Sequence, residues 1–151
     1  MKRIVGLLFL CIMALTLFAC GQDQASDKEV LELLKDYKTV QYNIKDPLNP
    51  PSGTEIGEKV KGYFREDEYE KQMANRVFQI APEIAKASNK SIQLENVKLK
   101  KSKENKDGTI DYDYTIKLKL YDDQSSEEIE KNGQLTVDGL KITRDWEDRS
   151  S

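Results

Sequence analysis

Two hydrophobic periodicities divide the chain near residue 90. Before it, apolar side chains recur every three or four residues, and after it they recur every second residue. The first spacing predicts amphipathic helices, and the second predicts half-buried strands. Helices followed by strands predict an α+β fold, with N-terminal helices packed on a four-stranded antiparallel sheet.

The first predicted helix covers about residues 27–44. Ser26 and Glu29 have the spacing of a capping box, which marks a helix start. The positions that continue its apolar stripe are Val30, Leu34, Tyr37, Gln41 and Ile44. Residues 46–53 contain three prolines and a glycine, and these end the helix.

Two further helical segments are predicted before the strands. One begins near Thr54, and the other runs from about Glu66 to Ala87. Pro82 lies inside the second segment, where a proline removes one backbone hydrogen bond and crowds the preceding turn. We therefore expect this helix to be kinked or split at Pro82.

Four strands are predicted, at about residues 91–100, 109–121, 128–137 and 140–147. A phase slip at Glu95 and Asn96 predicts a β-bulge in the first strand. Asp138 and Gly139 favour a tight hairpin turn between the last two. The short connections predict an antiparallel meander with one face covered by the helices.

The inward positions of the sheet supply the candidate ligand-facing residues. The alternation from Ile110 to Leu120 has no error and places Tyr112 and Tyr114 on the inner face. The same phase count predicts that Arg144 and Trp146 of the last strand also point inward. If the interior binds a small molecule, these four side chains lie nearest to it, whereas plain core packing is the simpler explanation of the aromatic residues.

The first twenty residues have the pattern of an export signal. Lys2 and Arg3 precede an apolar run over residues 4–18, which is shorter than the ~20 residues of a membrane-spanning helix. The run ends in Leu-Phe-Ala-Cys-Gly, which resembles the lipobox of bacterial lipoproteins, although Phe18 is larger than the residue usual there. The resemblance implies that Cys20 receives a diacylglycerol and becomes the mature N-terminus. The alternative is an ordinary secretory signal with a chance cysteine.

This interpretation divides the chain into a signal peptide (1–19), a lipidated cysteine with a tether (20–26) and one α+β domain (27–151). The expected location is the outer face of the cytoplasmic membrane, or the outer membrane if the source is Gram-negative. The lysine-rich composition and short tether suggest a Gram-positive source. Expected partners are membrane lipid, through the Cys20 anchor, and an envelope protein.

The composition excludes several kinds of site. The chain has no histidine, and beyond the signal its only cysteine is Cys20. A Ser-His-Asp triad, a Cys-His pair, a histidine or cysteine metal site and an internal disulfide are therefore excluded. A net charge of −3 makes nonspecific nucleic-acid binding a poor hypothesis. We predict no catalytic residue, no metal and no cofactor.

Three charged segments have a structural and a functional interpretation. Residues 105–111 resemble part of a calcium loop, but Lys103 and Tyr114 occupy positions that require acidic ligands, so a strand-joining turn is expected. The lysines over residues 98–106 either contact anionic lipid or protect a strand edge. The acidic segment 122–130 has two functional interpretations, contact with a basic partner or weak binding of calcium. Its structural interpretation is a loop that keeps the protein soluble.

The element order resembles the small cone-shaped folds called NTF2-like and cystatin-like. The resemblance rests on residues 133–137 followed by 140–146, together with Gly62, Tyr63 and Phe64. The resemblance implies a curled sheet around the helices and a function in binding or interaction, as in many Gram-positive lipoproteins, some from conjugative elements. Three hypotheses remain: a protein-interaction module, a small-ligand cone and, remotely, a proton-transfer enzyme.

Overall fold

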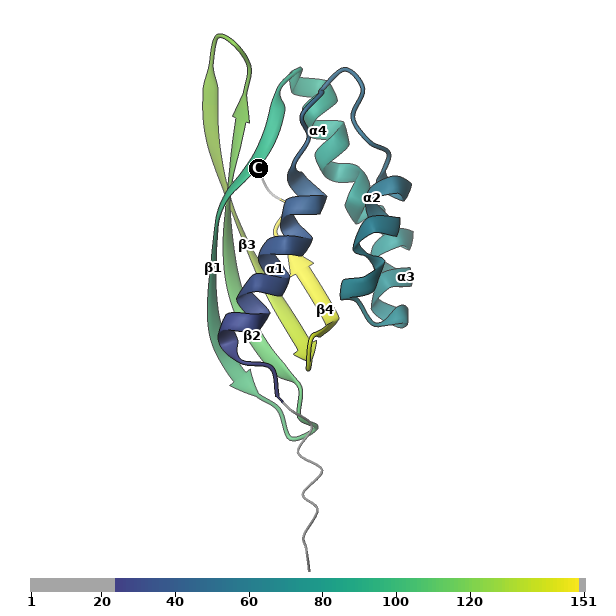
Figure 1. Ribbon diagram of the computed structural model, residues 1–151, viewed down its shortest axis with the longest axis vertical. Helices are drawn as coiled ribbons and strands as arrows, with labels where there is room; N and C mark the ends of the chain where they lie inside the picture. Colours follow the sequence, from purple (N-terminus) through teal and green to yellow (C-terminus); the bar gives the residue numbers. More distant parts are fainter. Residues whose placement is uncertain (1–23, 150–151) are drawn as a thin grey trace, which may run out of the picture.

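Helices cover one face of a twisted antiparallel sheet in the computed structural model, which describes residues 24–149 (Figure 1). The helices are α1 (Asp27–Tyr42), α2 (Gly53–Val60), α3 (Glu66–Ala74) and α4 (Ile80–Ser88), with 3₁₀ turns at Lys61–Tyr63 and Val77–Gln79. The strands are β1 (Ser91–Glu104), β2 (Ile110–Tyr121), β3 (Ser126–Asp138) and β4 (Lys141–Glu147). Helix α1 lies along the sheet, and the three shorter helices gather beside it. The predicted α+β class is confirmed.

The sheet is an open meander in the order β1-β2-β3-β4, as the short connections between the predicted strands indicate. All three neighbouring pairs are antiparallel. The register between β1 and β2 shifts between Leu94 and Asn96, so the bulge predicted there is confirmed. Local twist increases at a bulge, which helps the long strands to bend around α1.

Paired polar groups set the start of each of the first two helices. The Ser26 hydroxyl accepts the Glu29 amide at 3.3 Å, and the Glu29 carboxylate accepts the Ser26 amide at 2.8 Å. Ser52 and Glu55 repeat the arrangement at α2. The predicted first helix is two residues too long, because Ile44 leaves the helix and forms a β-bridge to Ile92.

The long third helix is split, but not at Pro82. Helix α3 ends at Ala74, and Arg76 adopts the left-handed conformation with φ of 55°. A new 3₁₀ turn and α4 follow. Pro82 is the third residue of α4, where its missing amide has no partner to lose in the helix. The prediction of a break at Pro82 is therefore wrong in position.

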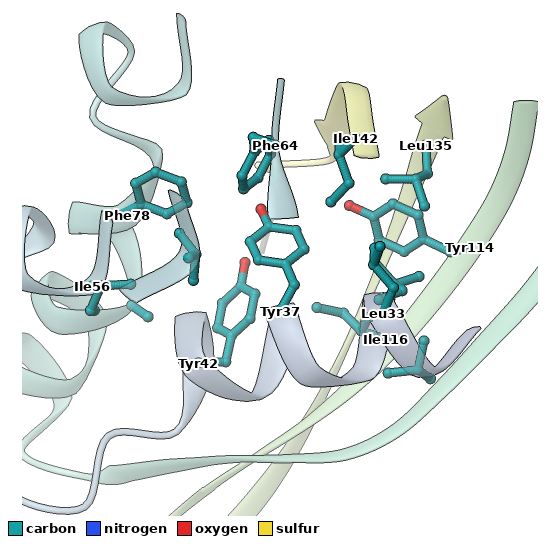
Figure 2. Close-up of a cluster of buried hydrophobic side chains, with 14 of the residues drawn as sticks. Leu33, Tyr37, Tyr42, Ile56, Phe64, Phe78, Tyr114, Ile116, Leu135 and Ile142 are labelled. Carbon is teal, nitrogen blue, oxygen red and sulfur yellow. The ribbon is translucent and has the colours of Figure 1, made fainter. Parts of the chain in front are cut away.

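The core lies between the inner face of β2 and the buried side of the helices. All six inward residues predicted for β2 are buried, from Ile110 to Leu120. Aromatic rings link the helices, since Phe64 lies edge-on to Tyr37 at 5.0 Å between centroids and to Phe78 at 6.1 Å. Figure 2 shows these rings beside the aliphatic side chains of the sheet. Each fully buried side chain of this size contributes about 1.5–3 kcal/mol relative to exposure.

Candidate functional site

A one-residue bulge in β4 changes which side chains enter the interior. Val137 pairs with Ile142, but Thr136 pairs with Arg144, so Thr143 is an extra residue between them. Because strand side chains alternate, every side chain after the bulge lies on the face of the sheet opposite to the predicted one. Asp145 is buried as a result, and Trp146 is 53% exposed.

The prediction that Arg144 and Trp146 point inward is therefore wrong. Both lie on the outer face of the sheet. Tyr112 and Tyr114 are buried on the inner face, as predicted. The Tyr112 hydroxyl donates to Asp27 Oδ1 at 2.7 Å, so the four side chains do not converge on one pocket.

Asp145 is the centre of a buried polar cluster that the sequence analysis missed. Its Oδ2 accepts the Tyr37 hydroxyl at 2.7 Å and the Lys38 ammonium at 2.9 Å. Its Oδ1 accepts the Tyr114 hydroxyl at 2.8 Å. Three donors from α1 and β2 thus hold one carboxylate of β4.

Glu147 forms the second half of the cluster. Its Oε2 accepts Lys38 at 2.8 Å and Tyr114 at 3.2 Å, and its Oε1 accepts the Tyr42 hydroxyl. Lys38 is fully buried and also donates to Gln41 at 3.2 Å. Removing an ammonium from water costs several kcal/mol, which this ion pairing and hydrogen bonding offset.

Side chains of α3 hold the backbone on the other side of Asp145. The Asp145 amide donates to Glu68 Oε1 at 3.0 Å, and its carbonyl accepts Gln72 Nε2 at 2.8 Å. Gln72 also donates to Glu68 at 2.6 Å. The backbone of β4 is therefore tied to α3, while its side chains are tied to α1.

The electrostatics of the cluster follow from burial and from the two carboxylates. Burial alone lowers the pKa of Lys38, but Asp145 and Glu147 together outweigh it, and the pKa is raised. Burial raises the pKa of Tyr37, Tyr42 and Tyr114 well above 10, and the neighbouring carboxylates raise it further. The three hydroxyls stay protonated donors and Lys38 stays charged throughout the physiological range.

The hydrogen bonds of the cluster are satisfied within the protein. Every buried side-chain nitrogen and oxygen in residues 24–149 has a hydrogen-bond partner. The cleft that reaches Asp145 and Glu147 from outside measures about 210 Å³, below the ~300 Å³ at which small-molecule pockets usually begin. We interpret the cluster as a structural link between the first helix and the last strand.

The surface offers a different kind of site, at the unpaired half of β3. Strand β4 pairs only with residues 133–138, whereas β3 begins at Ser126. Within the described chain, residues 126–131 therefore have a backbone partner on one side only, because the pairing on the β4 side ends where the Asn132 carbonyl accepts the Asp148 amide at 2.8 Å. We call residues 126–131 the open β3 edge.

An apolar groove lies beside the open β3 edge. It has a volume of about 600 Å³ and separates α4 from the inner face of the sheet. Ile84 and Ala87 line its helical wall, and Leu118, Leu120 and Ile129 line its sheet wall. A free strand edge next to an apolar groove is the geometry by which many domains bind an extended segment of another protein.

Two other kinds of site find no support in residues 24–149. No group of three or more acidic, cysteine or histidine side chains there is arranged to hold a metal ion. No helix in that range is long and apolar enough to cross a membrane. The lipobox and Cys20 lie outside the described residues.

Comparison by sequence finds neither a matching protein family nor a matching curated protein. Comparison of structures finds the fold in several solved proteins. An IcmL-like type IV secretion system protein from Legionella pneumophila superposes with a TM-score of 0.58 at 13% identity, covering 85% of this chain and 96% of that one. The periplasmic domain of DotI gives 0.57 at 10% identity, covering 86% and 100%.

The same arrangement occurs in a Gram-positive transfer protein. TraH from the conjugative plasmid pIP501 superposes with a TM-score of 0.55 at 18% identity, covering 84% of this chain and 97% of that one. Identities this low show a shared fold of helices and an open four-stranded sheet, spanning nearly the whole of each of these structures.

Proposed function

We propose that this chain is a lipid-anchored, extracytoplasmic protein-interaction domain of a bacterial envelope assembly. The open β3 edge with its adjoining groove is the observation that carries the proposal, because it is a surface suited to another polypeptide. Its fold neighbours support an envelope setting, since their names place them in type IV secretion, conjugative transfer or the periplasm.

The position of Gln24, the first described residue, agrees with this role. Gln24 donates to Glu104 at 3.3 Å, which puts the first described residue beside the hairpin that joins β1 and β2. The open β3 edge starts at the β2–β3 hairpin, at the opposite end of the sheet (Figure 1). With Cys20 as the lipid anchor, the edge faces away from the bilayer and is accessible to other envelope proteins.

The interior gives the two alternative functions less support than the surface gives to the interaction function. A ligand cone needs free space beside Tyr112 and Tyr114, but their hydroxyls are bonded to Asp27 and Asp145. A proton-transfer enzyme needs an accessible carboxylate inside the cone. Asp145 is inside, but three donors already occupy it and Lys38 neutralises its charge.

The test is cross-linking in intact host cells. The full chain is purified from membranes after cross-linking, and a Cys20→Ala form serves as the control for anchoring. We expect one envelope protein in near-equal amount with the wild-type chain and its loss with Cys20→Ala, which should also leave the membrane fraction. A wild-type chain that stays in the membrane fraction but recovers no protein would contradict the interaction function.

A further inference from the structure

We propose that the open β3 edge accepts, as a fifth strand, an extended partner segment in which basic and apolar residues alternate. This inference rests on the proposed interaction function and specifies its partner. Three properties of the edge carry it: the direction of its backbone groups, the apolar groove on one face and the acidic side chains on the other.

The backbone groups of alternate residues point out of the open edge. The Asp122 amide donates to the Ser125 carbonyl at 3.0 Å, which closes the hairpin and fixes which later pairs bond to β2. The Asp148 amide donates to the Asn132 carbonyl at 2.8 Å, on the β4 side. Because strand backbone groups alternate in direction, both bonds agree that Glu128 and Glu130 direct their amides and carbonyls outward.

The inner face determines which side chains of an added strand become buried. Glu127, Ile129 and Lys131 share this face, and Ile129 is only half-buried at the side of the groove. An added strand would place every second side chain next to Ile129 and opposite Ile84 of α4. Those positions favour apolar residues, since they would cover apolar wall that water now contacts.

The outer face determines the charge of the remaining side chains. Glu128 and Glu130 project there, next to the acidic turn that contains Asp122 and Asp123. Lys117 of β2 contacts Glu128 at 2.6 Å from the paired side, which leaves the unpaired side of the edge acidic. Opposite charges stabilise neighbouring strand positions, so the added strand should carry lysine or arginine there.

The same charges select against the simplest self-association. Two copies joined through this edge would place glutamates of one chain beside glutamates of the other, and like charges directly opposite destabilise strand pairing. The edge is therefore better suited to a basic strand than to the same edge of a second copy. A copy could instead offer its β1 edge, where Lys98 and Lys100 alternate with Val97 and Leu99, and sedimentation tests that pairing.

The binding test uses a labelled synthetic peptide and the full lipidated chain in detergent. The peptide alternates lysine with valine and leucine over seven residues, and its matched control carries glutamate in place of lysine. Fluorescence polarisation should show binding of the basic peptide only. Equal binding of both peptides, or of neither, would overturn the proposal.

Variants at one position separate backbone pairing from charge. Glu130→Pro removes an amide that points outward and leaves the β2 pairing intact, so it should weaken binding by about tenfold or more. Glu130→Gln keeps the amide and should weaken it by about threefold. The control Glu32→Gln changes charge on the exposed side of α1 and should leave affinity unchanged. Equal affinity for wild-type chain and Glu130→Pro, with unchanged melting temperature, would exclude strand addition.

Cross-linking in intact cells tests the strand-addition inference separately from the proposed interaction function. A partner recovered by the wild-type chain and lost with Glu130→Pro supports both. A partner recovered equally by both leaves the interaction function standing and overturns the edge as its site. Sedimentation of the purified chain completes the test, because self-association that Glu130→Pro abolishes would assign the edge to a second copy and overturn a separate partner.

Discussion

The ammonium of Lys38 lies 2.9 Å from Oδ2 of Asp145, although 107 residues separate the two in the chain. The contact joins the first helix to the last strand inside the core. Both side chains are almost completely buried, and the ion pair offsets part of the hydration that each loses, with Glu147 as a second carboxylate beside Lys38.

Asp145→Asn tests this pair. The change removes a buried negative charge and leaves Lys38 with Glu147 alone, so we expect a loss of about 3–5 kcal/mol in the free energy of unfolding. Urea unfolding followed by circular dichroism measures it. Arg65→Gln breaks the exposed ion pair with Asp138 and should cost less than about 1 kcal/mol. Similar losses for both variants would show that the buried ion pair contributes no more to the free energy of unfolding than the exposed one.

Gly133 is required by Tyr114, which pairs with it across β2 and β3. A methyl group on Gly133 would collide with the Tyr114 ring and with the Trp146 carbonyl. Gly133→Ala should therefore displace Tyr114 from Asp145 and cost about 2–4 kcal/mol, from overpacking and a lost buried hydrogen bond.

Gly62→Ala is the matched control for that substitution. A methyl group there meets no atom within 4 Å. It should leave the urea midpoint unchanged or raise it slightly. If Gly133→Ala also leaves the urea midpoint unchanged, the Tyr114 ring is not packed against Gly133.

Stability should fall steeply above about pH 10. Unfolded tyrosine and lysine lose their protons near pH 10 to 10.4, whereas the folded state raises the pKa of Tyr37, Tyr42, Tyr114 and Lys38. The folded state then holds more protons than the unfolded state, so stability decreases with pH, by up to about 1.4 kcal/mol per pH unit for each group. The stabilisation is complete below pH 10 and is lost above it.

Urea midpoints between pH 8 and pH 11 check this alkaline loss. Tyr42→Phe removes one titrating group and should make the decline shallower. Tyr121→Phe, at the outer end of β2, is the comparison. A midpoint that stays constant up to pH 11 would argue against the buried hydroxyl cluster.

The break between α3 and α4 depends on Arg76 and not on Pro82. Arg76→Gly relieves the left-handed backbone conformation at φ of 55° and should stabilise the fold by up to about 1 kcal/mol. Pro82→Ala should change the unfolding free energy by less than about 1 kcal/mol, because residue 82 lies in the first turn of α4. A larger loss for Pro82→Ala than for any change at Arg76 would reverse this assignment.

The sequence predicts the sheet well wherever alternation is unbroken. Strand β2 keeps one phase from Ile110 to Leu120, and all its inward residues are buried. In β4, Thr143 adds one residue opposite β3, and nothing in its side chain marks a bulge. Either phase puts a charged residue inward, Arg144 in one and Asp145 in the other, so the sequence could not choose between them.

The burial of Lys38 could have been predicted from the helical pattern of the sequence. Lys38 lies four residues after Leu34 and four before Tyr42, which are both buried on α1. A lysine on the apolar stripe predicts a buried anion, but its partners are more than 100 positions away. The open β3 edge could not be predicted from the sequence either, because it depends on how two strands pair. It exists because β3 is longer than β4.

The Lys38 contact also bears on the order in which the chain folds. A polypeptide emerges from the ribosome with α1 first and β4 last. Until Asp145 and Glu147 arrive, α1 has a cation on its apolar face and lacks the two carboxylates that it is buried against in the folded protein. Closure of the core around α1 is therefore coupled to the addition of the last strand.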